Sequence, residues 1–189
     1  MAFAVEDRPI RPLTAEEVLR MVEMGILAED EPVELLHGAL TEVSPKSPAH
    51  EAIKHRLITW LWPGVVESRY LVRVEAPILV PDRTSLPEPD VAVVEPRDYT
   101  TRHPASALLV IEVAVSSLII DTAVKPALYA AADVPEVWVV DVPSRRLTVF
   151  DDPKAGRYSG RRDVAGHGPV RPAHVDAPPL ALSTLFAGL

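Results

Sequence analysis

The feature that most constrains this 189-residue chain is an eight-residue apolar run that contains one carboxylate. The run extends from Leu108 to Val115, and the carboxylate belongs to Glu112. Its length and its valine and isoleucine content predict a central strand that is covered on both faces. A lone ionised carboxylate there would be costly unless it were paired or bound to a metal. The alternative is a strand that emerges at a sheet end, where Glu112 meets solvent or an arginine, and both interpretations stay open from the strand alone.

The segments around this run predict helices and strands that alternate along the chain. Helix signals are the capping pair Thr14 and Glu17, the Ser47-Pro48 start of a second helix, and an alanine-rich stretch at residues 129–132. Short β-branched runs predict strands at residues 70–80, 90–94, 137–140 and 147–150, with a hairpin over residues 33–43 that turns at His37-Gly38. This order predicts an α/β fold in which a mixed sheet is flanked by helices.

We expect one domain over residues 1–189, with a tail at residues 156–189 that is rich in glycine, proline and arginine. Apolar residues make up 48% of the chain, which excludes disorder as the default state. The absence of cysteine removes disulfides, thiolate metal sites and cysteine nucleophiles. Eight glycines form no phosphate-cradling loop, which argues against a nucleotide-cofactor enzyme. The acid pair Glu6-Asp7 stands where a secretory signal would carry bases, so we expect a cytoplasmic protein.

The charge is unevenly distributed along the chain. A net charge of −8 argues against non-specific adhesion to nucleic acid, because phosphate neutralisation needs a surplus of basic residues. Residues 1–50 hold ten acids and four bases, whereas residues 51–189 hold seventeen acids and fifteen bases. The near balance of charge beyond residue 50 leaves room for a nucleic-acid surface there, although composition alone does not predict one. Its candidate phosphate contacts, each also typical of a solvated surface, are Lys54, Arg56, Arg69, Arg73, Arg161 and Arg162.

Two further residues accompany Glu112 as candidates for chemistry. Asp90 opens the apolar run 91–94, which could form a strand beside that of Glu112. Two converging carboxylates would suit Mg²⁺, which takes one or two carboxylates and keeps several waters. Lys125 stands near a helix start, where an ammonium could position water and offset phosphate charge. Pro126 disfavours helical geometry at Lys125, so either the helix begins at Pro126 with Lys125 as its cap, or the lysine points elsewhere.

Several of these pieces, in this order, resemble a known family. They are the runs 33–38, Ser44-Pro45 to His50, Pro89-Asp90, 111–113 with Ser116-Ser117, Asp121 with Lys125, and 129–141. Over about residues 12–150 the chain resembles the bacterial Uma-two family of restriction endonucleases. This family looks like a branch of the PD-(D/E)XK nuclease superfamily, whose fold is a mixed sheet flanked by helices. The resemblance implies a metal-dependent endonuclease that hydrolyses phosphodiester bonds of DNA.

The resemblance also implies roles for individual residues. Asp90 and Glu112 would bind Mg²⁺ or Mn²⁺, with the main-chain carbonyl of Val113 as a further ligand. The superfamily lysine normally stands two residues after the second acid, where this chain has Ala114. By the resemblance, the lysine is displaced to the following helix, which points to Lys125.

Three more residues take supporting roles by the same resemblance. Glu34 would be an additional acid of the catalytic set. His50 would contact the phosphate or a water of the metal, and the candidate phosphate contacts Lys54 and Arg56 stand on the same predicted helix. Asp121 would cap the helix or support Lys125. By contrast, Asp152-Pro153-Lys154 fits an acid-x-lysine spacing, but we interpret it as an exposed loop.

Two other functions remain open. A non-enzymatic binding or assembly protein with the nuclease fold would fit the acidic charge and Pro126. A metal hydrolase of small phosphorylated molecules would have a small closed pocket beside Asp90. A homodimer is expected for a nuclease that cuts two strands, because the apolar loop 117–120 and the apolar run 180–189 need cover.

Overall fold

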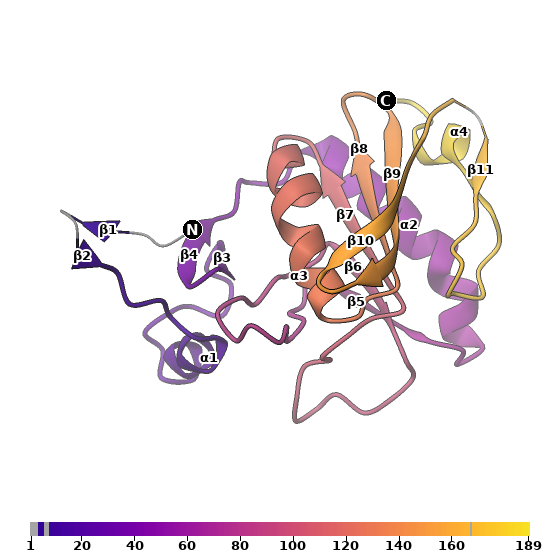
Figure 1. Cartoon of the computed structure of the whole chain (residues 1–189). Coiled ribbons are helices and arrows are strands. Elements are labelled where there is room, and N and C mark those ends of the chain that lie inside the picture. Colours follow the sequence, from indigo (N-terminus) through magenta and orange to yellow (C-terminus); the bar gives the residue numbers. More distant parts are fainter. Residues whose placement is uncertain (1–3, 6–7, 167) are drawn as a thin grey trace.

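The structure, a computed structural model, describes residues 4–5, 8–166 and 168–189, so the acid pair Glu6-Asp7 lies outside the described residues. Its main feature is a six-stranded mixed sheet with the order β10-β9-β8-β7-β6-β5 (Figure 1). All neighbours pair antiparallel except β7 and β8, which are parallel. The strands are β5 (Leu71–Val74), β6 (Val91–Val94), β7 (Leu109–Ala114), β8 (Glu136–Asp141), β9 (Arg146–Lys154) and β10 (Arg157–Val164).

Strand β7 lies inside this sheet, and all six of its residues are buried. Successive side chains of a strand point to opposite faces. Leu109, Ile111 and Val113 join a core on the side of helix α2 (Pro48–Val66), whereas Val110 and Ala114 join a core on the side of helix α3 (Lys125–Ala131). Figure 1 shows the two helices on opposite sides of the sheet. The predicted mixed sheet flanked by helices is confirmed, and Glu112 belongs to the α3 face.

Helix α2 begins where the sequence predicts. The Ser47 hydroxyl accepts the N–H of His50 at 3.2 Å, and Pro48 occupies the first turn, where its missing N–H costs nothing. Leu57 and Leu61 are fully buried against the sheet. This helix start fixes His50 close to the end of the sheet where β7 finishes.

Helix α3 departs from both alternatives that Pro126 suggested. A π-helix, η1 (Ile120–Val124), leads directly into α3, and Lys125 is itself helical, with φ −61° and ψ −37°. The N–H of Lys125 bonds to the carbonyl of Ile120, five residues earlier. This wider turn accommodates the ring of Pro126, which has no N–H to donate. The expected loop 117–120 is also helical from Leu118 onward.

The N-terminal elements lie on one side of the sheet (Figure 1). They are β1 (Ala4–Val5), β2 (Arg8–Pro9), α1 (Ala15–Glu23), β3 (Val33–Leu36) and β4 (Ala39–Glu42). Both bonds of the predicted capping box between Thr14 and Glu17 are present. The β3–β4 hairpin turns at His37 and Gly38, with φ values of 50° and 82°. The N–H of Leu86 bonds to the carbonyl of Leu35 at 2.8 Å, which ties the hairpin to the segment before Asp90.

Other segments correct the sequence-based expectations. The strand expected over residues 70–80 ends at Val74, because Glu75 takes a positive φ of 47°. Asp152-Pro153-Lys154 is not a loop but the end of β9, which pairs with β10. The segment is nevertheless exposed, as expected, because the Lys154 and Asp152 side chains are 70% and 55% exposed.

The tail also folds onto the sheet. It forms β10, β11 (Pro169–Val170), β12 (Leu180–Ala181) and helix α4 (Leu182–Leu185). Leu182 and Leu185 are fully buried in the α2-side core. The apolar run 180–189 therefore finds cover within its own chain, which corrects the expectation that it needs a partner. Within the described segments, no helix has both the length and the apolar character that a bilayer span requires.

Candidate active site

The sheet register brings Asp90 and Glu112 together. In the antiparallel pair of β6 and β7, Val91 lies opposite Ile111 and Ala92 opposite Val110. One further step along the same register places Asp90 across from Glu112. Residues directly opposite in an antiparallel pair share a face, with Cβ atoms about 5 Å apart. Two carboxylates that are distant in sequence therefore meet at the end of the sheet.

Asp90 is held from two directions. Its Oδ2 accepts the main-chain N–H of Val113 at 2.7 Å, and its Oδ1 lies 3.0 Å from Nε2 of His50. The side chain of Asp90 is 13% exposed, so a face of it remains accessible. The other ring nitrogen of His50 lies 3.3 Å from Glu51. Each carboxylate oxygen accepts more than one bond, so these contacts orient Asp90 and leave lone pairs available.

Glu112 is enclosed by the α3 helix. Lys125 Nζ lies 3.3 Å from its Oε1 and 3.4 Å from its Oε2, and the hydroxyl of Tyr129 donates to Oε1 at 2.5 Å. Residues four apart on a helix share a face, so Asp121, Lys125 and Tyr129 form one stripe directed at Glu112. Asp121 lies 3.8 Å from Lys125 and accepts a hydrogen bond from Ser117.

The β3–β4 hairpin supplies a third carboxylate. Glu34 Oε1 lies 3.1 Å from Lys125 Nζ and accepts the N–H of Glu88 at 2.7 Å. The hairpin therefore contacts both the lysine of α3 and the segment that leads into Asp90. The structure brings together all four residues proposed for the catalytic set, namely Glu34, Asp90, Glu112 and Lys125.

Burial and charge shift the pKa values of this cluster. Burial raises the pKa of Glu112 well above its usual range, and burial also raises the pKa of Asp121. Burial alone would lower the pKa of Lys125, but attraction to Glu112, Glu34 and Asp121 outweighs it and the pKa rises. Burial opposes the charged form of His50 as well, yet the hydrogen bond to Asp90 and the charge of Asp90 leave the His50 pKa raised. Lys125 is thus a permanent cation and cannot act as a base near neutral pH.

The cluster lines a pocket of about 270 Å³. Its walls come from β3, β4, the loop that leads into α2, the start of α2, Asp90 before β6, the end of β7, η1 and the first residue of α3. Seven carboxylates line it against two lysines and one histidine, so the pocket is strongly acidic. The titratable residues of the lining are Glu34, Glu42, Lys46, His50, Glu75, Glu88, Asp90, Glu112, Asp121 and Lys125.

The donor set fits a hard divalent cation. Around Lys125 stand Glu34, Glu112 and Asp121, and the single ammonium leaves an excess of negative charge that a cation would offset. In the part of the chain that the structure describes, no three acidic or histidine side chains form a ready cage for a metal. The set that fits is two carboxylates with a main-chain carbonyl, and Mg²⁺ accepts such a site because it keeps several waters.

Other candidate residues lie elsewhere or are already engaged. Lys54 contacts Glu51 at 2.7 Å and also pairs with Glu75 at the edge of the pocket. Arg56 does not line the pocket, because its guanidinium donates to the carbonyl of Leu185 at 2.7 Å.

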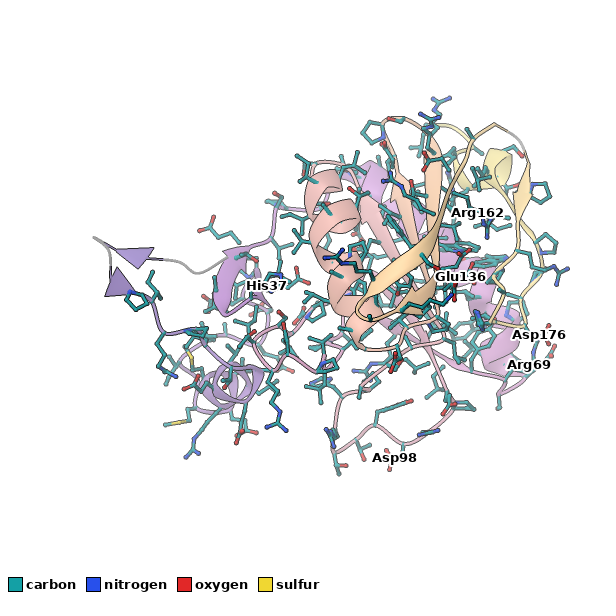
Figure 2. All side chains as sticks on the ribbon, viewed as in Figure 1. His37, Arg69, Asp98, Glu136, Arg162 and Asp176 are labelled. Atoms are coloured by element: carbon teal, nitrogen blue, oxygen red, sulfur yellow. The ribbon has the colours of Figure 1, made fainter. Side chains whose placement is uncertain are left out.

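The other four candidate phosphate contacts, all of them arginines, also lie outside the pocket. In Figure 2, Arg69 lies beside Asp176 and Arg162 near Glu136, on the side of the molecule away from His37. Arg73 contacts His103, and Arg161 lies over the ring of Phe150.

Sequence reasoning missed Tyr129 as a site residue. In the sequence it is only one member of the alanine-rich helix. In the structure its hydroxyl is the closest partner of Glu112, and its ring is fully buried. The signal that could have found it was its spacing of four residues from Lys125, which places both on one helix face.

This geometry defines a class of protein. Its elements are a mixed sheet flanked by helices, with two acids and a lysine at the end of the central strands. The chain belongs to the Uma2 family, described as "Putative restriction endonuclease", whose model matches residues 15–175. This match extends into the tail, beyond the resemblance seen over residues 12–150.

A solved structure supports the fold. The chain is similar to a protein from Anabaena variabilis ATCC 29413 that is described as a "putative nuclease belonging to DUF820". The two share 16% sequence identity with a TM-score of 0.74, over 93% of this chain and 98% of the other. No curated protein matches the chain. The family match therefore covers most of the chain, and the solved structure shows that the fold is shared.

Proposed function

We propose that this protein is a metal-dependent endonuclease that hydrolyses phosphodiester bonds of DNA. The observation that carries the proposal is the convergence of Asp90 and Glu112 in one register, with Lys125 Nζ 3.3 Å from Glu112. Asp90 and Glu112 would hold Mg²⁺ or Mn²⁺ together with the carbonyl of Val113. The N–H of Val113 donates to Asp90. In a strand, the N–H and the C=O of one residue point towards the same neighbouring strand, so the carbonyl of Val113 also faces the side of Asp90.

The chain's own residues have distinct tasks in this proposal. A bound divalent cation would supply Lewis-acid charge that stabilises a phosphoryl oxygen and makes water more acidic. Lys125 carries a fixed positive charge that stabilises the charge developing on the attacked phosphate and donates to the attacking water. Tyr129 and Lys125 fix the Glu112 carboxylate from one side. His50 and the N–H of Val113 fix Asp90, which is how an outer contact orients a ligand.

The proposed partner is DNA, in keeping with the family. The acidic pocket disfavours a phosphate group until cation charge is added, so substrate binding and metal binding would be coupled. A metal hydrolase of small phosphorylated molecules shares this acidic pocket, and a binding protein with the nuclease fold shares the architecture. Cleavage and metal binding separate the three functions.

We also propose a homodimer. Leu118, Ile119 and Ile120 are 37%, 79% and 39% exposed at the rim of the pocket, and a second copy of the chain would cover them. This position would set two active sites close to one contact surface, as cutting two strands requires.

The test is cleavage of supercoiled plasmid with Mg²⁺ or Mn²⁺. The wild-type chain should nick or linearise the plasmid, and EDTA should abolish the reaction. Asp90→Ala should lower the rate by orders of magnitude, since each 1.4 kcal/mol of lost transition-state stabilisation is about tenfold in rate.

The matched control is Asp152→Ala, which removes an exposed carboxylate outside the pocket that pairs with Lys154 of β9 and Ser159 of β10. It should cut at the wild-type rate. Equal rates for wild type and Asp90→Ala would contradict the proposed site. Metal binding without cleavage of DNA, but with release of phosphate from small phosphate esters, would support the small-molecule hydrolase instead.

A further inference from the structure

A second pocket lies away from the acidic cluster and has the opposite character. It measures about 520 Å³ and is lined by Ser144, Arg145, Arg146, Ala165, Gly166, Leu182, Ser183 and Phe186. Among the residues that the structure describes, no carboxylate belongs to this lining, whereas seven line the first pocket. Two guanidinium groups and two serine hydroxyls give it a set of donors. Such a set is suited to an anion with several oxygens, above all a phosphate.

The surrounding segment is basic in an acidic protein. Residues 145–171 hold seven lysines and arginines against three aspartates, a net charge of +4, while the whole chain carries −8. The rest of the chain therefore carries −12. This segment therefore contributes a positive charge that attracts a polyanion.

The two arginines of the pocket are available for a ligand. Arg11, Arg69, Arg97 and Arg162 each lie within ion-pair distance of a carboxylate of the chain. Arg145 and Arg146 are exposed, and within the described ranges no ion pair or side-chain hydrogen bond engages either of them. Their charge is thus directed to solvent at the mouth of the pocket.

The position of this pocket relates it to the acidic one. Ala114, two residues after Glu112, pairs with Asp141 of β8, and Asp141 pairs with Arg146 of β9. The N–H of Val142 also bonds to the carbonyl of Ala114 at 3.0 Å. Both pockets therefore lie at the same end of the sheet, and the β8–β9 turn lies at that end in Figure 1.

The offset between the pockets follows from the strand spacing. Neighbouring strands are about 4.8 Å apart, so β9, which carries Arg146, lies about 10 Å from β7, which carries Glu112, and about 14 Å from β6, which Asp90 precedes. At a rise of about 3.4 Å per nucleotide, this offset corresponds to about three to four nucleotides of one DNA strand.

We propose that the pocket of Arg145 and Arg146 binds a backbone phosphate of the nucleic acid whose scissile phosphate lies over Asp90 and Glu112. This inference rests on the proposed function for the location of the scissile phosphate. The acidic pocket needs cations before it accepts a phosphate, and the arginine pocket attracts the same strand without them. The strand is thereby held about three to four nucleotides from the reacting bond.

The test measures affinity and its salt dependence. A short fluorescein-labelled DNA duplex is titrated with protein by anisotropy, in Ca²⁺ buffer, between roughly 50 and 200 mM salt. The variant Arg145→Gln/Arg146→Gln should bind about tenfold more weakly at low salt, because two charged hydrogen-bond donors are removed. The slope of log affinity against log salt should also fall in magnitude by about one for each phosphate that the variant no longer neutralises.

The matched control is Arg20→Gln/Arg102→Gln, which removes the same charge from two exposed arginines outside both pockets. Its salt slope should equal that of the wild type. An unchanged slope in Arg145→Gln/Arg146→Gln, an equal loss in both double variants, or no binding of the duplex by the wild type would overturn the inference. The measurement needs no cleavage. If the wild type cuts plasmid and the arginine variant binds DNA as the wild type does, this inference alone is refuted. If both proteins bind with the predicted slopes but the wild type cuts nothing, only the proposed nuclease activity is refuted.

Discussion

Lys125 is the residue on which the chemistry of the site is centred. Its ammonium lies 3.1 Å from Glu34 and 3.3 Å from Glu112, while 8% of the side chain remains exposed. A buried charge is tolerated only when it is paired, and here the carboxylates exceed the cation in number. The cluster therefore has an excess of negative charge that one additional cation would offset. This excess affects the binding of protons as well as of metals.

Metal binding should release protons. Burial raises the pKa of Glu112 well above its usual range, so the metal-free protein keeps a proton there at pH values where an exposed glutamate has lost it. A cation must displace this proton, and its affinity should rise with pH until the pH exceeds the raised pKa. Mn²⁺ calorimetry in two buffers with different ionisation enthalpies measures the protons released. A heat that is independent of the buffer at every pH would contradict the expectation.

Tyr129→Phe tests how Glu112 is held. The change removes the hydroxyl that donates to Glu112 at 2.5 Å and leaves the buried ring in place. A hydrogen bond to a charged group contributes about 1.5–3 kcal/mol, so the expected result is Mn²⁺ affinity reduced by about tenfold or more. Tyr70→Phe is the control, since the hydroxyl of Tyr70 donates to the carbonyl of Leu61 far from the site. Equal Mn²⁺ affinity in the two variants would show that Tyr129 does not position Glu112.

The site could be predicted from the sequence only as far as local signals reach. Glu112 was visible because a carboxylate within an apolar strand is costly, and Asp90 because it opens the neighbouring strand. The hydrogen bond from Tyr129 was not visible, because it depends on the angle at which α3 crosses β7. The helical backbone of Lys125 was missed because a π-helix cannot be recognised from the proline that it accommodates.

At the scale of elements, the β3–β4 hairpin is the part that completes the cluster. It brings Glu34 to Lys125 through a tight turn at His37 and Gly38. Gly38 combines a positive φ of 82° with close packing, because an added Cβ would overlap the Cβ of Pro12 and lie 2.8 Å from its Cα. Only glycine fits this position without moving the segment that precedes α1.

Gly38→Ala should therefore lower the free energy of unfolding by more than backbone strain alone. The matched variant is Gly25→Ala, which has a φ of 69° but no heavy atom within 4 Å of the added Cβ. Strain of about 1–2 kcal/mol is common to both, so urea denaturation should show a larger loss for Gly38→Ala. Equal losses would mean that the hairpin shifts freely past Pro12.

The elements of the fold were predicted unevenly, and the reason is physical. Strand β7 and helices α1 and α2 carry strong apolar runs or capping residues, and these elements form where expected. The sequence of β10 has the pattern of a polar tail, because this strand lies at the sheet edge and its side chains alternate only weakly in burial. Its pairing is specified by the register with β9, which no local pattern within residues 157–164 reveals.

At the scale of the whole molecule, the apolar residues of the tail are buried within the chain, whereas those at the rim of the acidic pocket are exposed. The tail closes the α2-side core, and Glu136 contributes by accepting the N–H of Ala173 at 2.7 Å. The rim of the acidic pocket stays apolar and open, with Ile119 79% exposed. Together with Leu118 and Ile120 it forms a contiguous exposed apolar segment, which is typical of an interaction surface.

Ile119→Glu tests the proposed homodimer. Two added carboxylates at a contact between copies repel each other, so sedimentation should show a dimer for the wild type and a monomer for the variant. Val66→Glu is the control, because Val66 is 68% exposed at the far end of α2. A wild-type chain that sediments as a monomer at all concentrations would remove the dimer from the proposal.

The molecule as a whole is proposed to work by sharing one divalent cation between two carboxylates from neighbouring strands. The most direct test is a calorimetric titration of the wild-type chain and of Asp90→Ala with Mn²⁺, each checked for folding by circular dichroism. We expect one saturable site in the wild type and loss of that site in Asp90→Ala. Saturable binding of equal affinity in the two proteins, or none in the wild type, would contradict the shared cation.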